Sequence, residues 1–248
     1  MSPVLFLHGL FGSKKNNRGI SKVLARDLDR SVFAIDMRNH GESPQDNRHD
    51  YLAMAEDIAA FIEYHKLKEP VIIGHSMGAK VAMTLALRSP SLLASFIAVD
   101  NAPIDMAINK DFYLYMEAMK KIQNANITRQ AEADSIMRSF EKSVQIRQFL
   151  LGNLYRPAEG GAQKFRIPLN ILSKSLPNMG DFPFKDPQER RFEKQCLFIR
   201  GTQSPYVADD MLPLIGQFFP LFRLVDIDAG HWLISEQPEK FRRGIMFP

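Results

Sequence analysis

The sequence predicts an α/β protein with a mostly parallel sheet and helices on both of its faces. Two observations support this fold class. Short, continuous apolar runs, which are typical of strands buried in parallel sheets, alternate with segments of helical periodicity along most of the 248 residues. A hydrophobic content of 45% in a chain of this length also allows one domain with a large core.

Six apolar runs are the expected strands. They are Val4–Leu7, Val32–Ile35, Val71–Ile73, Phe96–Val99, Leu197–Ile199 and Phe222–Ile227. Helical patterns fill most of the gaps between them. We expect residues 1–103 and 188–248 to form one discontinuous core, because the alternation of strands and helices is interrupted only between these two segments.

Residues 104–187, between the fourth and fifth expected strands, are too many for an ordinary crossover. Their apolar residues recur at helical spacing. Examples are Phe112, Tyr113, Met116 and Met119, followed by Ile136, Phe140 and Val144. Such an insertion is most simply a helical lid over a site, and packing within the lid explains its methionines and aromatics more simply than substrate contact does. Residues 157–161 and 177–187 are expected to be loops.

The composition argues against nucleic acid as a partner, and the lengths of the apolar runs argue against a membrane span in this chain. With 32 basic and 28 acidic residues, the formal net charge is only +4, and no basic stripe interleaves with aromatics. No apolar run reaches the roughly 18 residues that a membrane span needs, and no signal peptide precedes the first strand. The single cysteine, Cys196, lies in an apolar run, so we expect it to pack in the core without a disulfide.

The run Gly74-His75-Ser76-Met77-Gly78 predicts a sharp turn that carries a nucleophilic serine. An apolar strand precedes the turn and helical sequence follows it, which is the context that a nucleophile elbow requires. Gly74 and Gly78 are expected where backbones crowd together, so that Ser76 can adopt a strained conformation near a helix N-terminus. A solvated serine in a surface turn is the alternative.

The stretch His8-Gly9-Leu10-Phe11-Gly12, after the first strand, predicts an oxyanion hole. In sites of this kind, the N–H of the residue after the nucleophile, here Met77, pairs with an N–H from the early loop, here that of Leu10. Each such donor is worth on the order of 3 kcal/mol of transition-state stabilisation. We expect the His8 side chain to tie down the loop rather than to transfer protons.

His231 is the expected general base. It lies in Asp228-Ala229-Gly230-His231-Trp232, directly after the last strand, where the chain order serine, acid, histidine places it. The neighbouring glycine allows the loop to bring the imidazole over Ser76. His75 is expected to point away from the pocket. Three further histidines have no matching acid in the sequence: His40, His49 and His65.

The acidic partner of the histidine has an unusual position. The loop after the fifth expected strand, a common place for this acid, reads Gly201-Thr202-Gln203-Ser204, and a serine cannot hold a carboxylate's charge. Asp100 ends the fourth expected strand and therefore lies at the catalytic rim of the sheet, so it is the preferred acid. A helix-capping or solvated aspartate is the alternative for Asp100. Other acids considered are Asp209, Asp210, Asp226, Asp228 and Glu236.

Five segments together resemble the α/β-hydrolase superfamily. They are residues 8–13, 36–43, 74–80, 99–103 and 228–232. More narrowly, the chain is similar to the group that contains small bacterial acyl esterases, mitochondrial abhydrolase-domain-containing proteins and yeast ethanol acetyltransferase. This group places its acid after the sixth strand of its sheet, which the resemblance carries onto Asp100. The resemblance runs from Val4 to about Gln237 and is more specific for fold and triad than for substrate.

The resemblance also implies segments that this chain lacks. Met1 is three residues from what would be the family's third strand, so the first two strands are expected to be missing. A shortened chain, a processed precursor or an incomplete gene model would each explain this. A mitochondrial location follows from the resemblance alone, since no targeting segment is present, and a cytoplasmic location is the alternative.

Together these residues predict a serine acyl hydrolase, either a carboxylesterase or a thioesterase. His231, oriented by Asp100, would remove the Ser76 proton as the hydroxyl attacks an ester or thioester carbonyl, and water would release the acyl-serine. The expected partner is a small ester, thioester or acyl-CoA. We expect no cofactor and no metal, because neither metal-ligand spacing nor a recognised phosphate loop is present.

Two other functions stay open on the sequence. An alcohol could intercept the acyl group, which would make the chain an alcohol O-acetyltransferase that uses acetyl-CoA and ethanol with the same triad. Lys14, Lys15 and Lys80 could then meet phosphates, although solvated surface lysines are the simpler explanation. Ser204 in the usual acid position would instead suit a binding protein that has lost catalysis. The sequence leaves acyl length and oligomeric state open.

Overall fold

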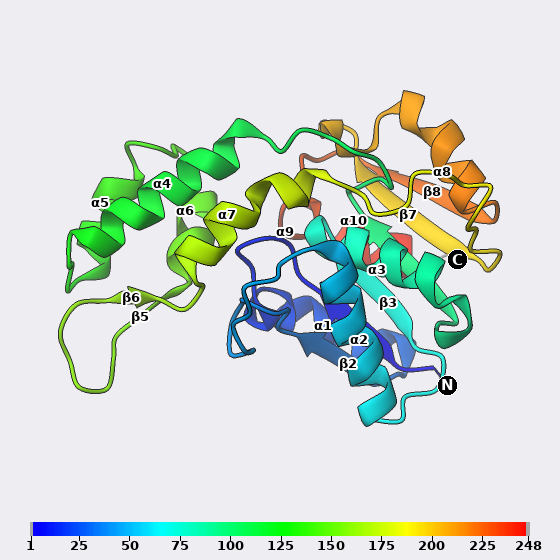
Figure 1. Ribbon diagram of the computed structural model, residues 1–248, viewed down its shortest axis with the longest axis horizontal. Helices are drawn as coiled ribbons and strands as arrows, with labels where there is room; N and C mark the ends of the chain where they lie inside the picture. The colour runs from blue at the N-terminus through cyan, green and yellow to red at the C-terminus, as the bar shows by residue number, and fades with distance from the viewer. Residues whose placement is uncertain (1, 247–248) are drawn as a thin grey trace.

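The computed structural model describes residues 2–246, and its centre is a six-stranded parallel sheet (Figure 1). The strands are β1 (Val4–Leu7), β2 (Val32–Ile35), β3 (Val71–His75), β4 (Ser95–Val99), β7 (Cys196–Gly201) and β8 (Phe222–Ile227). They lie in the order β2-β1-β3-β4-β7-β8, and each neighbouring pair is parallel. The six expected strands are confirmed, with ends that differ by at most two residues. Cys196 is buried, as expected.

Helices cover both faces of this sheet. In the core they are α1 (Lys14–Leu28), α2 (Tyr51–Tyr64), α3 (Met77–Arg88), α8 (Leu212–Phe218), α9 (Leu233–Glu236) and α10 (Pro238–Met246). Successive strand residues point to opposite faces. Phe6 therefore packs with Leu24 of α1 and Phe241 of α10, whereas Leu5 belongs to the apolar cluster on the other face with Ile58 of α2. Burial on both faces explains why the strand sequences are continuously apolar.

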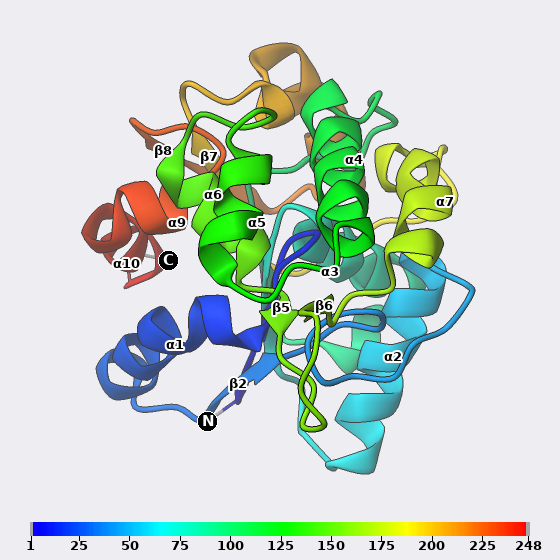
Figure 2. The same ribbon diagram turned by 90° about the vertical axis from the view of Figure 1, so that its left-hand side faces the viewer.

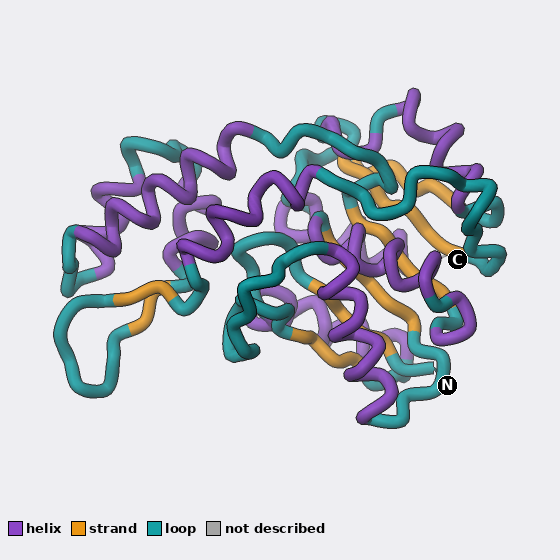
Figure 3. Tube along the Cα trace, viewed as in Figure 1, coloured by secondary structure: helices purple, strands orange, loops and turns teal. Residues whose placement is uncertain are grey.

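Four helices and a short hairpin lie between β4 and β7, at the carboxyl end of the sheet (Figures 1 and 2). They are α4 (Lys110–Asn124), α5 (Gln130–Met137), α6 (Val144–Leu151), α7 (Leu169–Gly180), β5 (Leu154–Tyr155) and β6 (Lys164–Phe165). Figure 3 shows the largely helical character of this insertion beside the strands of the core. Met116 and Met119 are buried, which agrees with packing as their role, whereas Tyr113 and Val144 are exposed.

The two loops expected in the insertion have different outcomes. Residues 157–161 lie in the connection between β5 and β6, as expected. The expectation for 177–187 is wrong at its start, because α7 continues through Pro177. A proline removes one main-chain hydrogen bond from a helix. However, Met179 is buried in this turn and its carbonyl accepts a hydrogen bond from the Tyr51 hydroxyl at 2.8 Å, so tertiary contacts outweigh the local signal.

One buried lysine connects the core to both stems of the insertion. Lys80 lies on α3 with 2% of its surface exposed, so the expectation of a solvated lysine is wrong. Its ammonium group donates hydrogen bonds to the main-chain carbonyls of Ile104, Gly180 and Asp181, at 2.9, 3.1 and 2.8 Å. Ile104 precedes α4, and the other two residues lie at the end of α7. The two stems therefore bury the Lys80 side chain and accept the hydrogen bonds of its ammonium group.

Replacing Lys80 with methionine should lower the free energy of unfolding by about 2–4 kcal/mol, because three partly buried carbonyls lose their shared donor. Chemical denaturation near neutral pH measures this loss. The matched control is Lys194→Met, since Lys194 binds the Leu93 carbonyl and Glu69 at a more exposed position. The control should lose less than about 1 kcal/mol. Equal losses in the two variants would contradict a fastening role for Lys80.

The wild type and the Lys80→Met variant should also differ in the response of their stability to alkaline pH. Burial lowers the pKa of Lys80 to about 8, whereas an unfolded chain keeps the value near 10.4. Between these values the unfolded state binds more protons than the folded state, so the contribution of Lys80 to stability rises with pH. The stability gap between wild type and Lys80→Met should therefore widen from about pH 8 to about pH 10.

Candidate active site

Ser76 occupies a sharp turn between β3 and α3. Its φ of 55° lies in the left-handed region, which few non-glycine residues adopt. A Cβ atom on Gly74 would lie 2.1 Å from the Gly78 carbonyl oxygen, and one on Gly78 would lie 2.6 Å from the carbonyl oxygen of Leu7. Glycine is therefore required at both positions, which is the reason for the sequence pattern around the serine.

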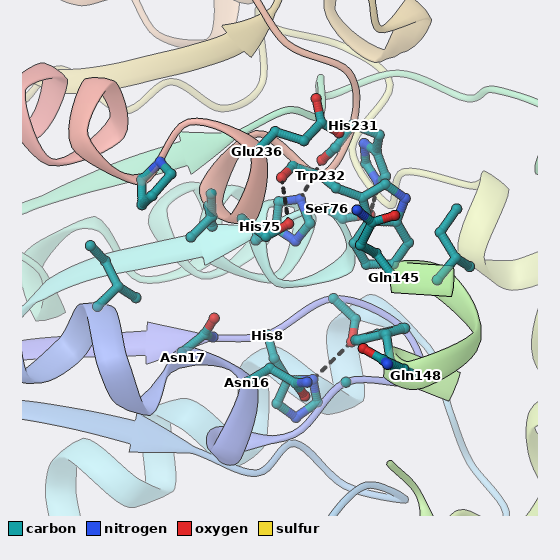
Figure 4. Close-up of a pocket in the computed structure, with 18 of the residues that line it drawn as sticks. His8, Asn16, Asn17, His75, Ser76, Gln145, Gln148, His231, Trp232 and Glu236 are labelled. Carbon is teal, nitrogen blue, oxygen red and sulfur yellow. Dashed lines mark hydrogen bonds between the residues drawn. The ribbon is translucent and has the colours of Figure 1, made fainter. Parts of the chain in front are cut away.

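His231 bridges Ser76 and Asp100. Its Nε2 lies 2.9 Å from Ser76 Oγ, and its Nδ1 lies 2.7 Å from Asp100 Oδ2. Figure 4 shows His231 beside Ser76 at the cavity. With the Nδ1–H donated to a carboxylate, Nε2 is free to accept the proton of the serine hydroxyl. The structure thus brings together the three residues that the sequence predicted for a triad.

Asp100 is completely buried at the end of β4 and is surrounded by donors. The Gly201 N–H donates to Oδ1 at 3.0 Å, and the hydroxyl of Ser204 donates to Oδ2, the oxygen that also binds His231. Ser204, which stands at the common position of the acid, therefore donates a hydrogen bond to Asp100, the carboxylate that takes over the acid's role. The Gly-x-x-Ser pattern signalled a displaced acid in the sequence, but this direct contact was not predicted.

The other carboxylates considered for the acid have different partners. Asp209 and Asp226 pair with Arg200, Asp228 accepts from Gln203, and Glu236 accepts from the Gly230 N–H. Asp210 is exposed in a 3₁₀ turn (Asp209–Met211). Among these acids and Asp100, only Asp100 has a hydrogen bond to His231.

Two buried histidines hold the loop after β1 in place. His8 Nε2 accepts a hydrogen bond from the Met37 N–H at 3.0 Å, and His40 Nε2 accepts one from the Phe11 N–H at 3.1 Å. His8 thus ties down the loop, as expected, and His40 is an additional brace that the sequence analysis missed. Leu10 and Met77 adjoin Ser76 at this point and line a small cavity with it. The predicted oxyanion residues are therefore close to the serine.

The expectation that His75 points away from the pocket is wrong. It lines the larger cavity beside Ser76, and its ring centroid lies 5.1 Å from that of His231 (Figure 4). His75 Nε2 donates to the main-chain carbonyl of His231 at 2.9 Å. This contact turns the ring toward the loop after β8 and corrects the expectation. Burial lowers the pKa of His75 to about 4, so the ring is neutral at neutral pH.

Ser76 lies between two cavities of very different size. The larger has a volume of about 780 Å³ and is lined by residues of α1, α6 and α9 together with the His231 loop. The smaller has a volume of about 30 Å³ and is lined by the oxyanion residues, Tyr206 and the stems of the insertion. A substrate carbonyl at Ser76 would therefore have one spacious side and one confined side.

Residues 2–246 contain no group of three or more histidine, cysteine, aspartate or glutamate side chains placed to hold a metal ion. None of the described helices is long and apolar enough to cross a membrane.

Comparison with known proteins identifies the family. Residues 2–122 match the family model described as alpha/beta hydrolase fold. An sn-1-specific diacylglycerol lipase ABHD11 from Xenopus laevis is 37% identical over 249 residues, which cover 98% of this chain and 78% of the lipase. The chain belongs to the α/β-hydrolase family.

Two more relatives of this α/β hydrolase carry different activities in their names. A probable alcohol acetyltransferase from Saccharomyces cerevisiae is 39% identical, over 98% of this chain and 76% of the relative. The solved structure of a marine microorganism esterase superposes with a TM-score of 0.90 at 33% identity, over 99% of this chain and 94% of the esterase. The expected resemblance and fold are confirmed. The mitochondrial location stays a prediction.

Acidification should destabilise this hydrolase through its buried histidines. Burial lowers the pKa of His8 to about 4 and the pKa of His40 well below its ordinary value. An unfolded histidine has a pKa near 6.5, so the unfolded state binds more protons between about pH 4 and pH 6.5. The stability that neutral His8 contributes is complete above this range and is lost as the pH falls through it. At about pH 5 the loss is about 2 kcal/mol.

The variant His8→Gln tests this prediction, because glutamine offers an acceptor to the Met37 N–H but does not titrate. Its free energy of unfolding should fall less than that of the wild type between about pH 7 and pH 5. His65→Gln is the matched control, since His65 is exposed at the end of α2. A pH response of His8→Gln as steep as that of the control would refute the assignment.

Proposed function

We propose that this chain is a serine-dependent acyl hydrolase, either an esterase or a thioesterase, that works through an acyl-serine intermediate. The observation that carries the proposal is the unbroken hydrogen-bonded chain from Ser76 through His231 to Asp100. A serine hydroxyl becomes a nucleophile when a positioned base removes its proton during attack. Ser76 also lines the large cavity, which supports access of a substrate carbonyl to its hydroxyl.

The proposed reaction begins as Ser76 Oγ bonds to the carbonyl carbon and its proton moves to His231 Nε2. Asp100 holds the Nδ1–H and stabilises the imidazolium that forms. The N–H groups of Leu10 and Met77 bind the oxyanion, each worth on the order of 3 kcal/mol. His231 then protonates the leaving oxygen or sulfur as its bond to carbon breaks. A water molecule, deprotonated by the same ring, then bonds to the acyl carbon, and the ring returns this proton to Ser76 Oγ as the bond between the acyl group and the serine breaks.

We further propose residues 1–103 and 188–248 as the catalytic unit and residues 104–187 as its lid. The support is the position of α6, which lines the large cavity through Gln145, Ile146, Gln148 and Phe149. Phe149 of α6 packs edge-on against Trp232, with ring centroids 4.7 Å apart. Trp232 follows His231 directly, so the insertion contacts the loop that carries the proposed base. A lid in this place would limit the access of water to the acyl-serine.

Alcohol acyl transfer is the second candidate function. The 39% identity to a probable alcohol acetyltransferase favours it. Chemically, an alcohol would take the place of water in the second half of the reaction and form an ester. Supplying an acyl donor with and without ethanol, and measuring the free acid against the ethyl ester, separates the two reactions. A dominant free acid would support the hydrolase.

A fluorophosphonate probe tests the proposed nucleophile. We expect the wild-type chain to be labelled at Ser76 and the Ser76→Ala variant to remain unlabelled, because the probe bonds covalently only to an activated serine. Ser235→Ala is the matched control, since Ser235 lines the same cavity but binds the Trp232 carbonyl. The control should be labelled like the wild type. Equal labelling of both variants, or no labelling at all, would favour a binding protein without catalysis.

The proposed acid is tested by comparing Asp100→Asn with Asp228→Asn. The first variant should lower turnover by about 10⁴-fold, because an amide does not stabilise the imidazolium or fix its tautomer. The second should lower turnover by less than about tenfold, because Asp228 binds Gln203 instead of His231. An exchange of the contacting pair, Asp100→Ser with Ser204→Asp, should restore part of the activity that Asp100→Ser alone loses. Comparable losses for Asp100 and Asp228 would contradict the assignment.

A further inference from the structure

The two cavities beside Ser76 can be assigned to the two halves of a substrate. His231 must protonate the leaving group in the proposed reaction, so the leaving group has to lie on the side of the serine that His231 faces. His231 lines the large cavity and is not among the residues that line the small one. Tyr206, which lines the small cavity, packs against the imidazole with ring centroids 4.3 Å apart and ring planes tilted by 36°. The leaving group therefore belongs in the large cavity, and the acyl group in the small one.

The small cavity has room for only a short acyl group. Its volume of about 30 Å³ is only about two to three times the roughly 10–15 Å³ that a cavity needs to hold one water molecule. Its walls include Met106 and Met179, which come from the two stems of the insertion. Their backbones are held: the Met106 N–H donates to the Gly180 carbonyl at 2.8 Å, and the Met179 carbonyl accepts from Tyr51. The stems that limit this cavity are also the segments that bind Lys80.

The large cavity is suited to an uncharged leaving group. Apart from Ser76 and the histidines, its polar lining consists mainly of side-chain amides and hydroxyls. Among the described residues that line it, Glu236 is the one with a charged carboxylate or cationic side chain. The phosphates of coenzyme A are normally bound by lysine, arginine or free N–H groups at a helix N-terminus. Of the lysines considered for phosphate contact, Lys14 pairs with Asp36 and Glu42, and Lys80 is buried against carbonyls. Lys15 is exposed and lies outside the lining.

The N-terminus of α1 borders this cavity but is already occupied. The Lys14 N–H donates to Asp36 Oδ1 at 2.7 Å, and the Ser13 N–H donates to Asn16 Oδ1 at 2.7 Å. A carboxylate at this position would also repel a phosphate. By contrast, the side-chain amides of Asn17, Gln145 and Gln148 line the cavity (Figure 4). Side-chain amides carry both donors and acceptors but no charge, so they suit a neutral oxygen, such as a hydroxyl, ether or ester oxygen, rather than a phosphate.

We infer that the substrate is an uncharged ester in which a short acyl group, acetyl or propionyl, is joined to a larger alcohol with both apolar and hydrogen-bonding parts. Asn17, Gln145 and Gln148 bind the polar atoms of the alcohol, while Ile20 and Trp232 contact its apolar part. Acyl groups of medium length are excluded by the stems of the insertion. Thioesters of coenzyme A are disfavoured because their phosphates find no cation. This inference rests on the proposed serine mechanism and specifies the substrate of that site.

Acyl length is tested with 2-naphthyl acetate, butyrate and octanoate, which share one large neutral leaving group. We expect kcat/KM to fall at least about tenfold from acetate to octanoate, because each methylene that does not fit costs a factor of that order. Met179→Ala and, separately, Met106→Ala should raise the octanoate-to-acetate ratio, whereas Ile20→Ala, in the other cavity, should leave the ratio unchanged. Octanoate hydrolysed by the wild type as fast as acetate would overturn the assignment of the small cavity.

The neutrality of the leaving group is tested with two acetyl thioesters. Acetyl-CoA and S-acetyl-N-acetylcysteamine share the reacting atoms, but only the first carries phosphates. We expect the neutral thioester to have a kcat/KM at least about tenfold higher, since the charged groups lose hydration without gaining a partner. A preference for acetyl-CoA would overturn this part of the inference. Fluorophosphonate labelling of Ser76 keeps the outcomes separate, because a labelled enzyme with the wrong preference refutes only the substrate class, whereas an unlabelled chain refutes the mechanism.

Discussion

A single imidazole ring imposes the tightest geometric constraint on this fold, because His231 must bind Ser76 and Asp100 at the same time. The two ring nitrogens have a fixed separation, so the serine and carboxylate oxygens must be held apart by a fixed distance. Main-chain hydrogen bonds of the sheet hold them: the Ser76 N–H donates to the Val99 carbonyl at 2.9 Å, and the Asp100 N–H donates to the Ile199 carbonyl at 2.8 Å. The positions of both side chains therefore follow from the order β3-β4-β7.

The parts of the site that follow strands were predictable from the sequence, and the parts set by distant contacts were not. The carboxyl ends of parallel strands meet at one edge of the sheet, so the sequence alone predicts that Ser76 and Asp100 lie close together. Lys80 could not be placed, because its burial depends on carbonyls 24 to 101 residues away, in the stems of the insertion. The direction of the His75 side chain was predicted wrongly for the same reason, because it is set by a hydrogen bond to the main-chain carbonyl of His231, 156 residues away.

The insertion restricts the site on one side and leaves it spacious on the other. At its stems, Lys80 and the Met106–Gly180 hydrogen bond fix the chain beside the small cavity. At its far side, α6 meets the core through side chains, such as Phe149 on Trp232, and Asn153, just after α6, donates to the Phe11 carbonyl at 2.8 Å. The stems are therefore held by hydrogen bonds of their main-chain groups to Lys80 and to each other, whereas the α6 side of the insertion is held mainly by side chains.

The displaced acid makes the site depend on the sheet more than on a loop. A carboxylate on the loop after β7 would take its position from the conformation of that loop. Asp100 instead follows β4 directly, and the loop after β7 supplies two donors, the Gly201 N–H and the Ser204 hydroxyl. With the histidine N–H, three donors surround one buried carboxylate and offset the cost of removing its charge from water. The same donors determine which carboxylate oxygen faces His231, so a serine at position 204 complements an acid at position 100.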